Sequence, residues 1–176
     1  MSEPSATPEY TDSYEDVSMF TLSGERESAL LEAQTECTFM WTTTAGDPVG
    51  VIMNFVYEEG AFWLTCTRRR KRVPAVERRP RVALAISSRG TNIGISQALT
   101  YKGDAAVLDD AATLQWFYPT LARKVRPFDE TARAAFVRHL DTPGRVVIRV
   151  TPDARIGFDS EAMFANSPAG STSTEL

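Results

Sequence analysis

The sequence predicts a mainly β domain: a closed or split antiparallel barrel of six or seven strands, with helices inserted late in the chain. Apolar segments with the alternation typical of strands follow one another through residues 38–108, and short turns rich in Gly, Pro, Asp and Glu separate the first of them. Consecutive strands joined by tight turns pair antiparallel. Because the helical patterns come late and do not alternate with the strands, a barrel is favoured over a doubly wound sheet.

Length and composition indicate a single globular domain. The chain has 176 residues, 43% of them hydrophobic and 24% charged, and a net charge of −4. We expect the folded domain to span residues 19–165. Residues 1–18 contain five acids and no Lys or Arg, which predicts a disordered acidic tail. Residues 166–176 are rich in Ser, Thr, Pro and Gly, which predicts a flexible polar tail.

No membrane segment or secretory signal is visible. No stretch approaches the roughly twenty apolar residues that span a bilayer, and the N-terminus lacks the basic start and apolar middle of a signal peptide. We therefore expect a cytoplasmic protein without a membrane anchor. In that compartment Cys37 and Cys66 stay reduced, and their apolar surroundings indicate small buried side chains rather than a disulfide.

The first predicted elements are a helix and three strands. The helix spans about residues 23–34, where Ser23 can cap the first turn. Its apolar stripe consists of Ala29, Leu30 and Ala33. Turns separate the three strands, so we expect an antiparallel meander. These strands span residues 38–43, 49–57 and 62–67.

The middle of the chain adds a helical turn and two more strands. The turn is expected over residues 73–79. Residues 82–86 alternate large and small side chains, which suits a barrel wall. The long strand predicted over residues 95–108 has two faces that both suit burial, and Gly103 is the expected site of a bulge or bend.

Two helices and two strands complete the prediction. Asp109 or Asp110 can cap the first helix, which Pro119 should kink or break, and Asp129 can cap the second. The inner stripe of the second helix consists of Ala132, Ala135, Phe136 and Leu140. Strands are expected over residues 145–150 and 154–158, around a turn at 151–153.

A short basic segment is the strongest indication of a binding site. Between Arg68 and Arg81 there are eight basic residues and one acid, Glu77, although the whole chain is acidic. The segment follows a strand that ends in the hydroxyls of Thr65 and Thr67. Guanidinium forks and hydroxyl donors both match phosphate oxygens, so this strand end is a plausible phosphate clamp. A solvated basic loop is the alternative.

Several motifs occur in a characteristic order, mostly within residues 36–108. They are Gly-Asp-Pro-Val-Gly at 46–50, Phe-Trp-Leu-Thr at 62–65 with Arg-Lys-Arg at 70–72, Arg-Pro-Arg-Val at 79–82, Ser-Gln at 96–97 with Tyr-Lys-Gly-Asp-Ala at 101–105, and the run from 145 to 159. This series resembles the FMN-binding split-barrel superfamily typified by pyridoxamine 5′-phosphate oxidase. It is most similar to the actinobacterial branch that uses FMN or the deazaflavin coenzyme F420.

The resemblance implies a homodimer with a cofactor, FMN or F420, at the subunit interface. Three residues at the strand end would line the isoalloxazine edge and the ribityl chain: Thr65, Cys66 and Thr67. Three cations would hold the phosphate: Arg70, Lys71 and Arg72. Gln97, from the later strand, would approach the ring.

Two features depart from the family pattern. Arg72 stands where the family often has Lys, which keeps the charge and adds bidentate geometry. The chain also lacks the C-terminal Arg-Leu-x-Pro type of segment with which the vitamin B6 oxidases grip pyridoxal phosphate. Pyridoxamine 5′-phosphate oxidase activity is therefore the weaker alternative. The basic segment has more arginines than one phosphate needs: Arg68, Arg69, Arg78 and Arg79. This surplus favours F420, which carries a polyglutamate tail. The alternative is that these arginines only keep a surface loop soluble.

The predicted function is an oxidoreductase that transfers hydride between bound FMN or F420 and a planar conjugated small molecule. Because the cofactor carries such chemistry, neither a catalytic side chain nor a metal is expected. The single histidine, His139, is interpreted as a core-edge residue. The alternative is a non-catalytic protein that binds or sequesters the cofactor. Nucleic-acid binding is disfavoured because no such motif surrounds the basic segment and the isoelectric point is near 5.1.

Overall fold

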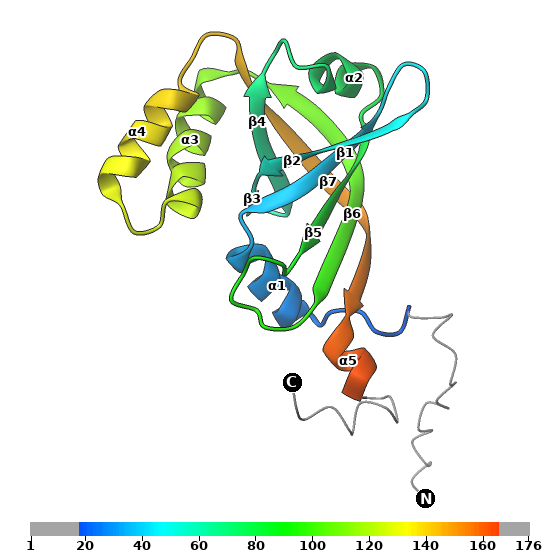
Figure 1. The fold of residues 1–176 in the computed structure, drawn as a ribbon. Helices are drawn as coiled ribbons and strands as arrows, with labels where there is room; N and C mark the ends of the chain where they lie inside the picture. The colour runs from blue at the N-terminus through cyan, green and yellow to red at the C-terminus, as the bar shows by residue number, and fades with distance from the viewer. Residues whose placement is uncertain (1–17, 166–176) are drawn as a thin grey trace, which may run out of the picture.

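The computed structural model describes residues 18–165 (Figure 1). The predicted tails therefore lie outside the described residues, apart from Ser18. The strands are β1 (Glu36–Thr42), β2 (Pro48–Asn54), β3 (Val56–Glu58), β4 (Ala61–Thr67), β5 (Arg81–Ser87), β6 (Gln97–Leu108) and β7 (Arg145–Asp159). The helices are α1 (Gly24–Ala33), α2 (Arg72–Arg78), α3 (Ala111–Val125), α4 (Glu130–Leu140) and α5 (Ser160–Ala165). Among these helices, none has the length and apolar character needed to cross a membrane.

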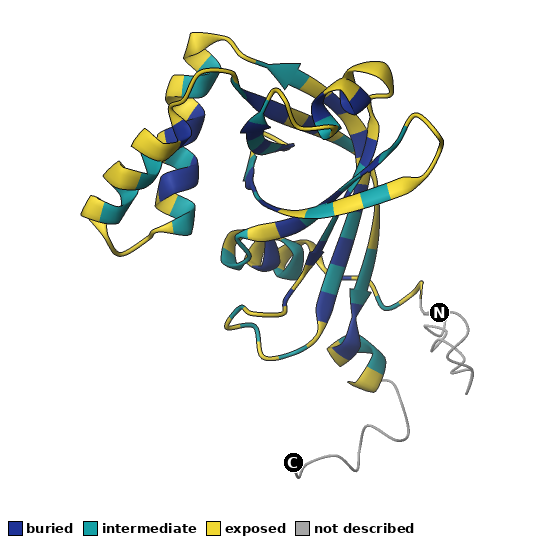
Figure 2. Cartoon of the chain, turned by 45° about the horizontal axis from the view of Figure 1, so that its top comes forward, coloured by how far each residue is buried: buried dark blue, intermediate teal, exposed yellow. Residues whose placement is uncertain are grey.

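The strands form one antiparallel sheet that curls into a half-barrel, which confirms the predicted fold class. The strand order is β2-β1-β5-β6-β7-β4-β3. In Figure 1, α3 and α4 form a hairpin on one side of the barrel, α2 lies near one end and α1 near the other. Figure 2 shows the buried residues concentrated on the strands and on the inner side of this hairpin.

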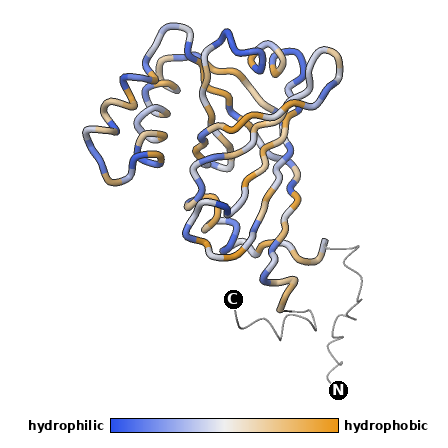
Figure 3. Tube along the Cα trace, viewed as in Figure 1, coloured by the Kyte–Doolittle hydropathy of each residue, from blue (hydrophilic) through white to orange (hydrophobic). Residues whose placement is uncertain are grey.

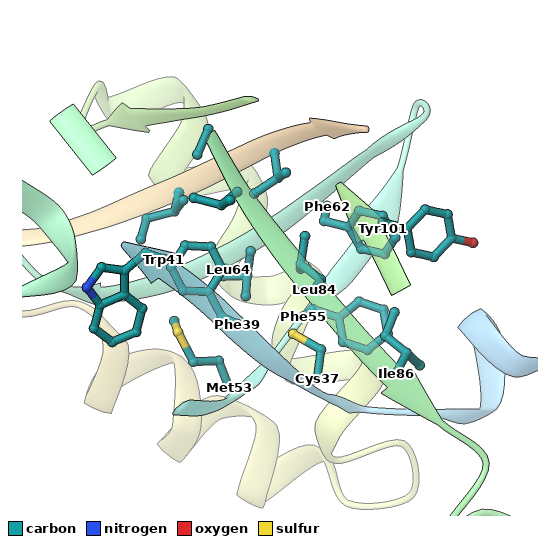
Figure 4. Close-up of a cluster of buried hydrophobic side chains, with 14 of the residues drawn as sticks. Cys37, Phe39, Trp41, Met53, Phe55, Phe62, Leu64, Leu84, Ile86 and Tyr101 are labelled. Atoms are coloured by element: carbon teal, nitrogen blue, oxygen red, sulfur yellow. The ribbon is translucent and has the colours of Figure 1, made fainter. Parts of the chain in front are cut away.

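The apolar core fills the inside of the curl. Its largest members come from five different strands or their junctions and are drawn in Figure 4. Phe62 lies at the centre of a ring cluster, with its centroid 4.7 Å from that of Tyr101 and 5.7 Å from that of Phe55. Burying each such side chain contributes about 1.5–3 kcal/mol. Cys37 and Cys66 are free and buried in this core, as predicted.

The predicted three-strand meander is wrong, because the segment 49–57 is not one strand. It divides at Phe55 into β2, on one edge of the sheet, and β3, on the other. Phe55 and Val56 are both buried, although they are neighbours in the sequence. Phe55 points into the barrel core, whereas Val56 packs with the α3–α4 hairpin. This change of face moves the chain across the barrel, and simple alternation along the sequence does not reveal it.

A bulge replaces the turn predicted at 151–153. β7 continues through this segment, and its pairing with β6 shifts register between Lys102 and Gly103, as predicted for Gly103. A Cβ atom on Gly103 would lie 2.2 Å from the carbonyl oxygen of Thr151, so the two strands approach too closely for a side chain. Pro152, which has no N–H to donate, is accommodated at this irregularity.

Only one face of β6 is buried within the described chain. Its residues alternate regularly between buried and partly or fully exposed positions as far as Ala106. Within the described chain, the predicted burial on both sides is therefore not found, and the second face would need a partner to cover it.

The predicted helix caps are largely confirmed. The side chains of Ser23, Asp110 and Asp129 each accept a backbone N–H in the first turn of α1, α3 and α4. Asp109 is not a cap, because Asp110 holds the N-cap position of α3; the Asp109 carboxylate pairs with Arg68 at 2.5 Å. α3 continues through Pro119, so this proline does not break it. The neighbouring Phe117, Tyr118 and Leu121 pack in one apolar cluster, and such packing can offset a missing hydrogen bond.

In each predicted apolar stripe one alanine is wrong, whereas Leu30, Phe136 and Leu140 are buried or packed as predicted. Ala29 is exposed, and the buried residues of α1 are Leu30 and Leu31. Ala135 is also exposed, and Val137 packs against the second cluster beside Phe136. In both helices a large apolar side chain replaces a predicted alanine, which agrees with the larger free energy gained by burying more apolar area.

Candidate functional site

The basic segment is held firmly against the end of β4. The N–H of Arg70 donates to the carbonyl of Thr67 at 3.0 Å, and the N–H of Val73 donates to the carbonyl of Arg70 at 2.9 Å. The N–H of Arg68 donates to the carbonyl of Gly144 at 2.7 Å, which ties the segment to the start of β7. These bonds turn the chain from β4 into α2 and leave a hydrophilic stretch on the surface (Figure 3).

A pocket of about 420 Å³ opens where β4 ends. It lies between the β2 edge of the sheet and the α3–α4 hairpin. Five of the predicted site residues line it: Thr65, Cys66, Thr67, Arg70 and Arg72. The other lining residues are Glu36, Ile52, Met53, Asn54, Leu121, Phe136, His139, Leu140 and Arg145. We call this the arginine pocket.

The charge of the arginine pocket suits an anion. Three guanidinium groups line it, from Arg70, Arg72 and Arg145, against one carboxylate, from Glu36. None of the ion pairs found within residues 18–165 includes any of these three arginines. Arg72 lies over the Trp41 ring, 5.6 Å from its centroid. Three guanidinium groups that form no ion pair among the described residues, at the end of a strand, fit a phosphate group.

Other arginines of the basic segment have partners within the chain. Arg68 pairs with Glu77 at 3.2 Å as well as with Asp109. Arg78 donates to the Thr44 hydroxyl and Arg79 to the Thr43 carbonyl, each at 2.9 Å. These interactions occupy three of the arginines that had favoured F420, so they give no preference between F420 and FMN.

The strand-end side chains supply polar groups and no charged nucleophile. The Thr65 hydroxyl donates to the Val146 carbonyl at 2.7 Å, which leaves its oxygen lone pairs to accept. Burial raises the pKa of the Cys66 thiol, and the nearby Arg72 guanidinium opposes this shift. The thiol is therefore protonated at neutral pH, and thiols attack only as thiolates.

Two predicted site residues do not line the arginine pocket. Lys71 is exposed at the N-cap position of α2. Gln97 lies at the start of β6 and Leu108 at its end. The end of β6 is the part near the pocket, because Leu108 and the pocket residue Thr65 both pair with Val147 of β7. The eleven steps from residue 97 to residue 108 span roughly 36 Å at ~3.3 Å per residue. Within the described chain, Gln97 therefore does not reach this pocket.

Gln97 instead lines a separate pocket of about 440 Å³ with Arg26, Ile93 and Glu161, among others. Its side chain is 3% exposed. Within residues 18–165, its amide oxygen has no hydrogen-bond partner. A buried polar atom in this state is a place where a further molecule can bind.

Sequence reasoning missed several lining residues. Asn54 ends β2, and Arg145 begins β7 directly opposite Thr67. Only the strand register brings Arg145 to the pocket, so its position in the sequence gave no signal. His139 was expected at the core edge but is exposed and lines the pocket from α4. Trp116, 38% exposed, packs edge-on against Trp63 outside this pocket.

The half-barrel and the phosphate-compatible pocket at its strand ends define a protein of the split-barrel superfamily. Sequence comparison gives the family: the model described as "Pyridoxamine 5′-phosphate oxidase" matches residues 27–157, and the chain belongs to this family. No curated protein matches the sequence.

Solved structures share the fold at low sequence identity. The conserved hypothetical protein Rv2991 from Mycobacterium tuberculosis is 14% identical, with a TM-score of 0.70 over 82% of this chain and 89% of its own. A protein named F420 Reductase is 22% identical, with a TM-score of 0.54 over 73% of this chain and 94% of its own. An FAD-binding protein from Mesorhizobium loti is 15% identical, with a TM-score of 0.56 over 78% of this chain and 94% of its own.

Proposed function

We propose that the protein is an oxidoreductase that binds FMN or coenzyme F420 in the arginine pocket and transfers hydride to or from a planar conjugated small molecule. The observation that carries this proposal is the convergence of three guanidinium groups and two strand-end hydroxyls on one pocket. Family membership and a structural relative named F420 Reductase support the same class of cofactor. When bound, the cofactor supplies the hydride chemistry.

The arginines of the pocket would bind the phosphate of the cofactor through charge-assisted hydrogen bonds. Arg70 comes from the turn after β4, Arg72 begins α2 and Arg145 begins β7, so the three groups approach from three places in the chain. A hydrogen bond to a charged group contributes about 1.5–3 kcal/mol. Lys71, beside them in the sequence, would add long-range attraction from its exposed position.

The end of β4 would orient the ring of the bound cofactor. Thr65 and Thr67, with the backbone at Cys66, would line the ring edge and the ribityl chain. Apolar side chains of β2, α3 and α4 would close the pocket and exclude water from the reacting face: Met53, Leu121, Phe136 and Leu140. A flat, electron-poor acceptor suits such a wall.

A second copy of the chain would complete the site. One row of side chains crosses the outward face of five strands: Ile52, Thr38, Ala85, Thr100 and Ile156. Ile52 is 64% exposed and Ile156 is 60% exposed, although both are large and apolar. A contiguous surface of small and apolar side chains is typical of a subunit interface. Because one subunit keeps Gln97 far from the arginine pocket, we propose that Gln97 of the partner subunit approaches the ring.

One alternative is a protein that binds or sequesters the cofactor without turnover. It is favoured by the neutral Cys66 thiol and by a lining made mainly of binding groups. Pyridoxamine 5′-phosphate oxidase activity is a weaker alternative.

The experiment is a two-stage test of binding and turnover. Purified protein is titrated with FMN and, separately, with F420, and the absorbance spectrum of each cofactor is followed. The reduced cofactor is then offered quinones, enones and tetrapyrrole-like acceptors with and without protein. We expect tight binding of one cofactor and a rate above that of the cofactor alone. Binding without any rate would favour the sequestering protein, and binding of neither cofactor would refute both proposals.

A further inference from the structure

A second pocket contains an amine that the proposed function does not use. It measures about 690 Å³ and lies between the C-terminal end of α1, β3 and the C-terminal half of α3. Its lining is Ser28, Leu31, Glu32, Ala33, Thr35, Val56, Tyr57, Glu58, Thr120, Arg123, Lys124, Val125 and Pro127. It shares no lining residue with the arginine pocket. We call it the lysine pocket.

Lys124 lies on the wall of the lysine pocket in apolar surroundings. Its amine donates to the Leu31 carbonyl at 2.8 Å, and it lies 3.9 Å from the centroid of the Phe55 ring. Among the residues that the structure describes, no carboxylate forms an ion pair with it. The Leu31 carbonyl belongs to the last turn of α1, so the contact also caps this helix.

These surroundings favour the neutral amine. Burial lowers the pKa of Lys124 to about 8, and the nearby Glu32 carboxylate acts in the opposite direction. Burial raises the pKa of the Cys37 thiol to about 12, so this thiol carries no charge at neutral pH. The other charged or titratable groups of the lining are Tyr57 and Glu58 from β3 and Arg123 from α3. At pH 7 about one Lys124 amine in ten is then neutral and able to attack a carbonyl.

We propose that the lysine pocket is a binding site for small apolar aldehydes, which condense with the Lys124 amine. The amine nitrogen forms a bond to the carbonyl carbon. The carbonyl oxygen and the two amine hydrogens leave as water, and a C=N bond remains. No oxidant or reductant takes part, and hydrolysis reverses the step. Leu31, Val56 and Val125 provide an apolar wall beside the amine, which suits a small aromatic aldehyde.

The chain offers an internal control, because it contains only three lysines: Lys71, Lys102 and Lys124. Lys71 and Lys102 are both exposed. The whole protein is treated with benzaldehyde and sodium cyanoborohydride, which fixes the imine as a stable secondary amine. Peptide mass spectrometry then measures the adduct at each lysine. At pH 7 we expect the adduct mainly at Lys124, with labelling that rises as the pH passes through about 8 and levels off above it.

Two variants distinguish the contribution of the amine to labelling from that of the pocket. Lys124→Arg keeps the positive charge but cannot form an imine, so only the background labelling of Lys71 and Lys102 should remain. Thr120→Phe narrows the pocket without changing the amine, so it should slow labelling of Lys124 alone. Labelling of Lys124 no faster than that of the exposed lysines would overturn the proposal, as would unchanged labelling in Thr120→Phe. Either failure leaves the cofactor proposal intact, because the two pockets share no residue.

Discussion

Replacing Arg72 by Ala should weaken cofactor binding without unfolding the protein. Its guanidinium faces the arginine pocket and lies over Trp41 at 5.6 Å. Loss of a charge-assisted hydrogen bond to phosphate removes about 1.5–3 kcal/mol, which corresponds to a rise in Kd of about 10- to 140-fold. The lost contact with Trp41 should lower the free energy of unfolding by only about 0.5–1 kcal/mol. Arg70→Ala should have a similar effect on binding.

Arg68→Ala provides a matched control from the same basic segment. Arg68 pairs with Glu77 and Asp109 at exposed positions, and such pairs contribute about 0–1 kcal/mol to stability. Its removal should leave cofactor affinity nearly unchanged. Calorimetric titration of the three variants with the cofactor that wild type binds measures the difference. Equal loss in Arg68→Ala and Arg72→Ala would show that the segment attracts the cofactor only by diffuse charge, and unchanged affinity in Arg72→Ala would remove this residue from the site.

Three further predictions concern the fold, the single histidine and the subunit contact. Gly103→Ala should lower the free energy of unfolding by about 3 kcal/mol, because its Cβ would lie 2.2 Å from a backbone oxygen of β7. Gly94→Ala, with no atom within 4 Å of the new Cβ, is the control, and equal effects in urea denaturation would contradict the bulge geometry. His139→Gln should leave any reductase rate within a few-fold of wild type, whereas a fall of about a hundredfold with intact folding would make His139 an acid or base. Wild type should sediment as a dimer at micromolar concentration and Ile52→Asp as a monomer; a monomeric wild type would refute the proposed interface.

Local signals predicted much of the fold. Ser23, Asp110 and Asp129 cap helices because their side chains can accept the free N–H groups of a first turn, which depends on neighbouring residues alone. The alternation over 82–86 is also local and matches the burial of β5. The same holds for much of the site, because the hydroxyls of β4 and the arginines of the next turn are close in sequence.

Long-range geometry was not predictable in the same way. Phe55 continues the apolar alternation of β2, so nothing local indicates that the chain crosses there to the opposite edge of the sheet. Pro152 indicates a turn by its residue type, and only the close approach of Gly103 makes it part of a bulge. Arg145 reaches the pocket through the register of β7 with β4, which depends on the whole sheet.

A crystal structure of the protein with the bound cofactor tests the central claim most directly. We predict the phosphate of FMN or F420 within hydrogen-bonding distance of Arg70, Arg72 and Arg145, with the ring along the end of β4. Gln97 of the partner subunit should lie beside the ring. A cofactor bound elsewhere, with its phosphate away from these arginines, would contradict the proposed site.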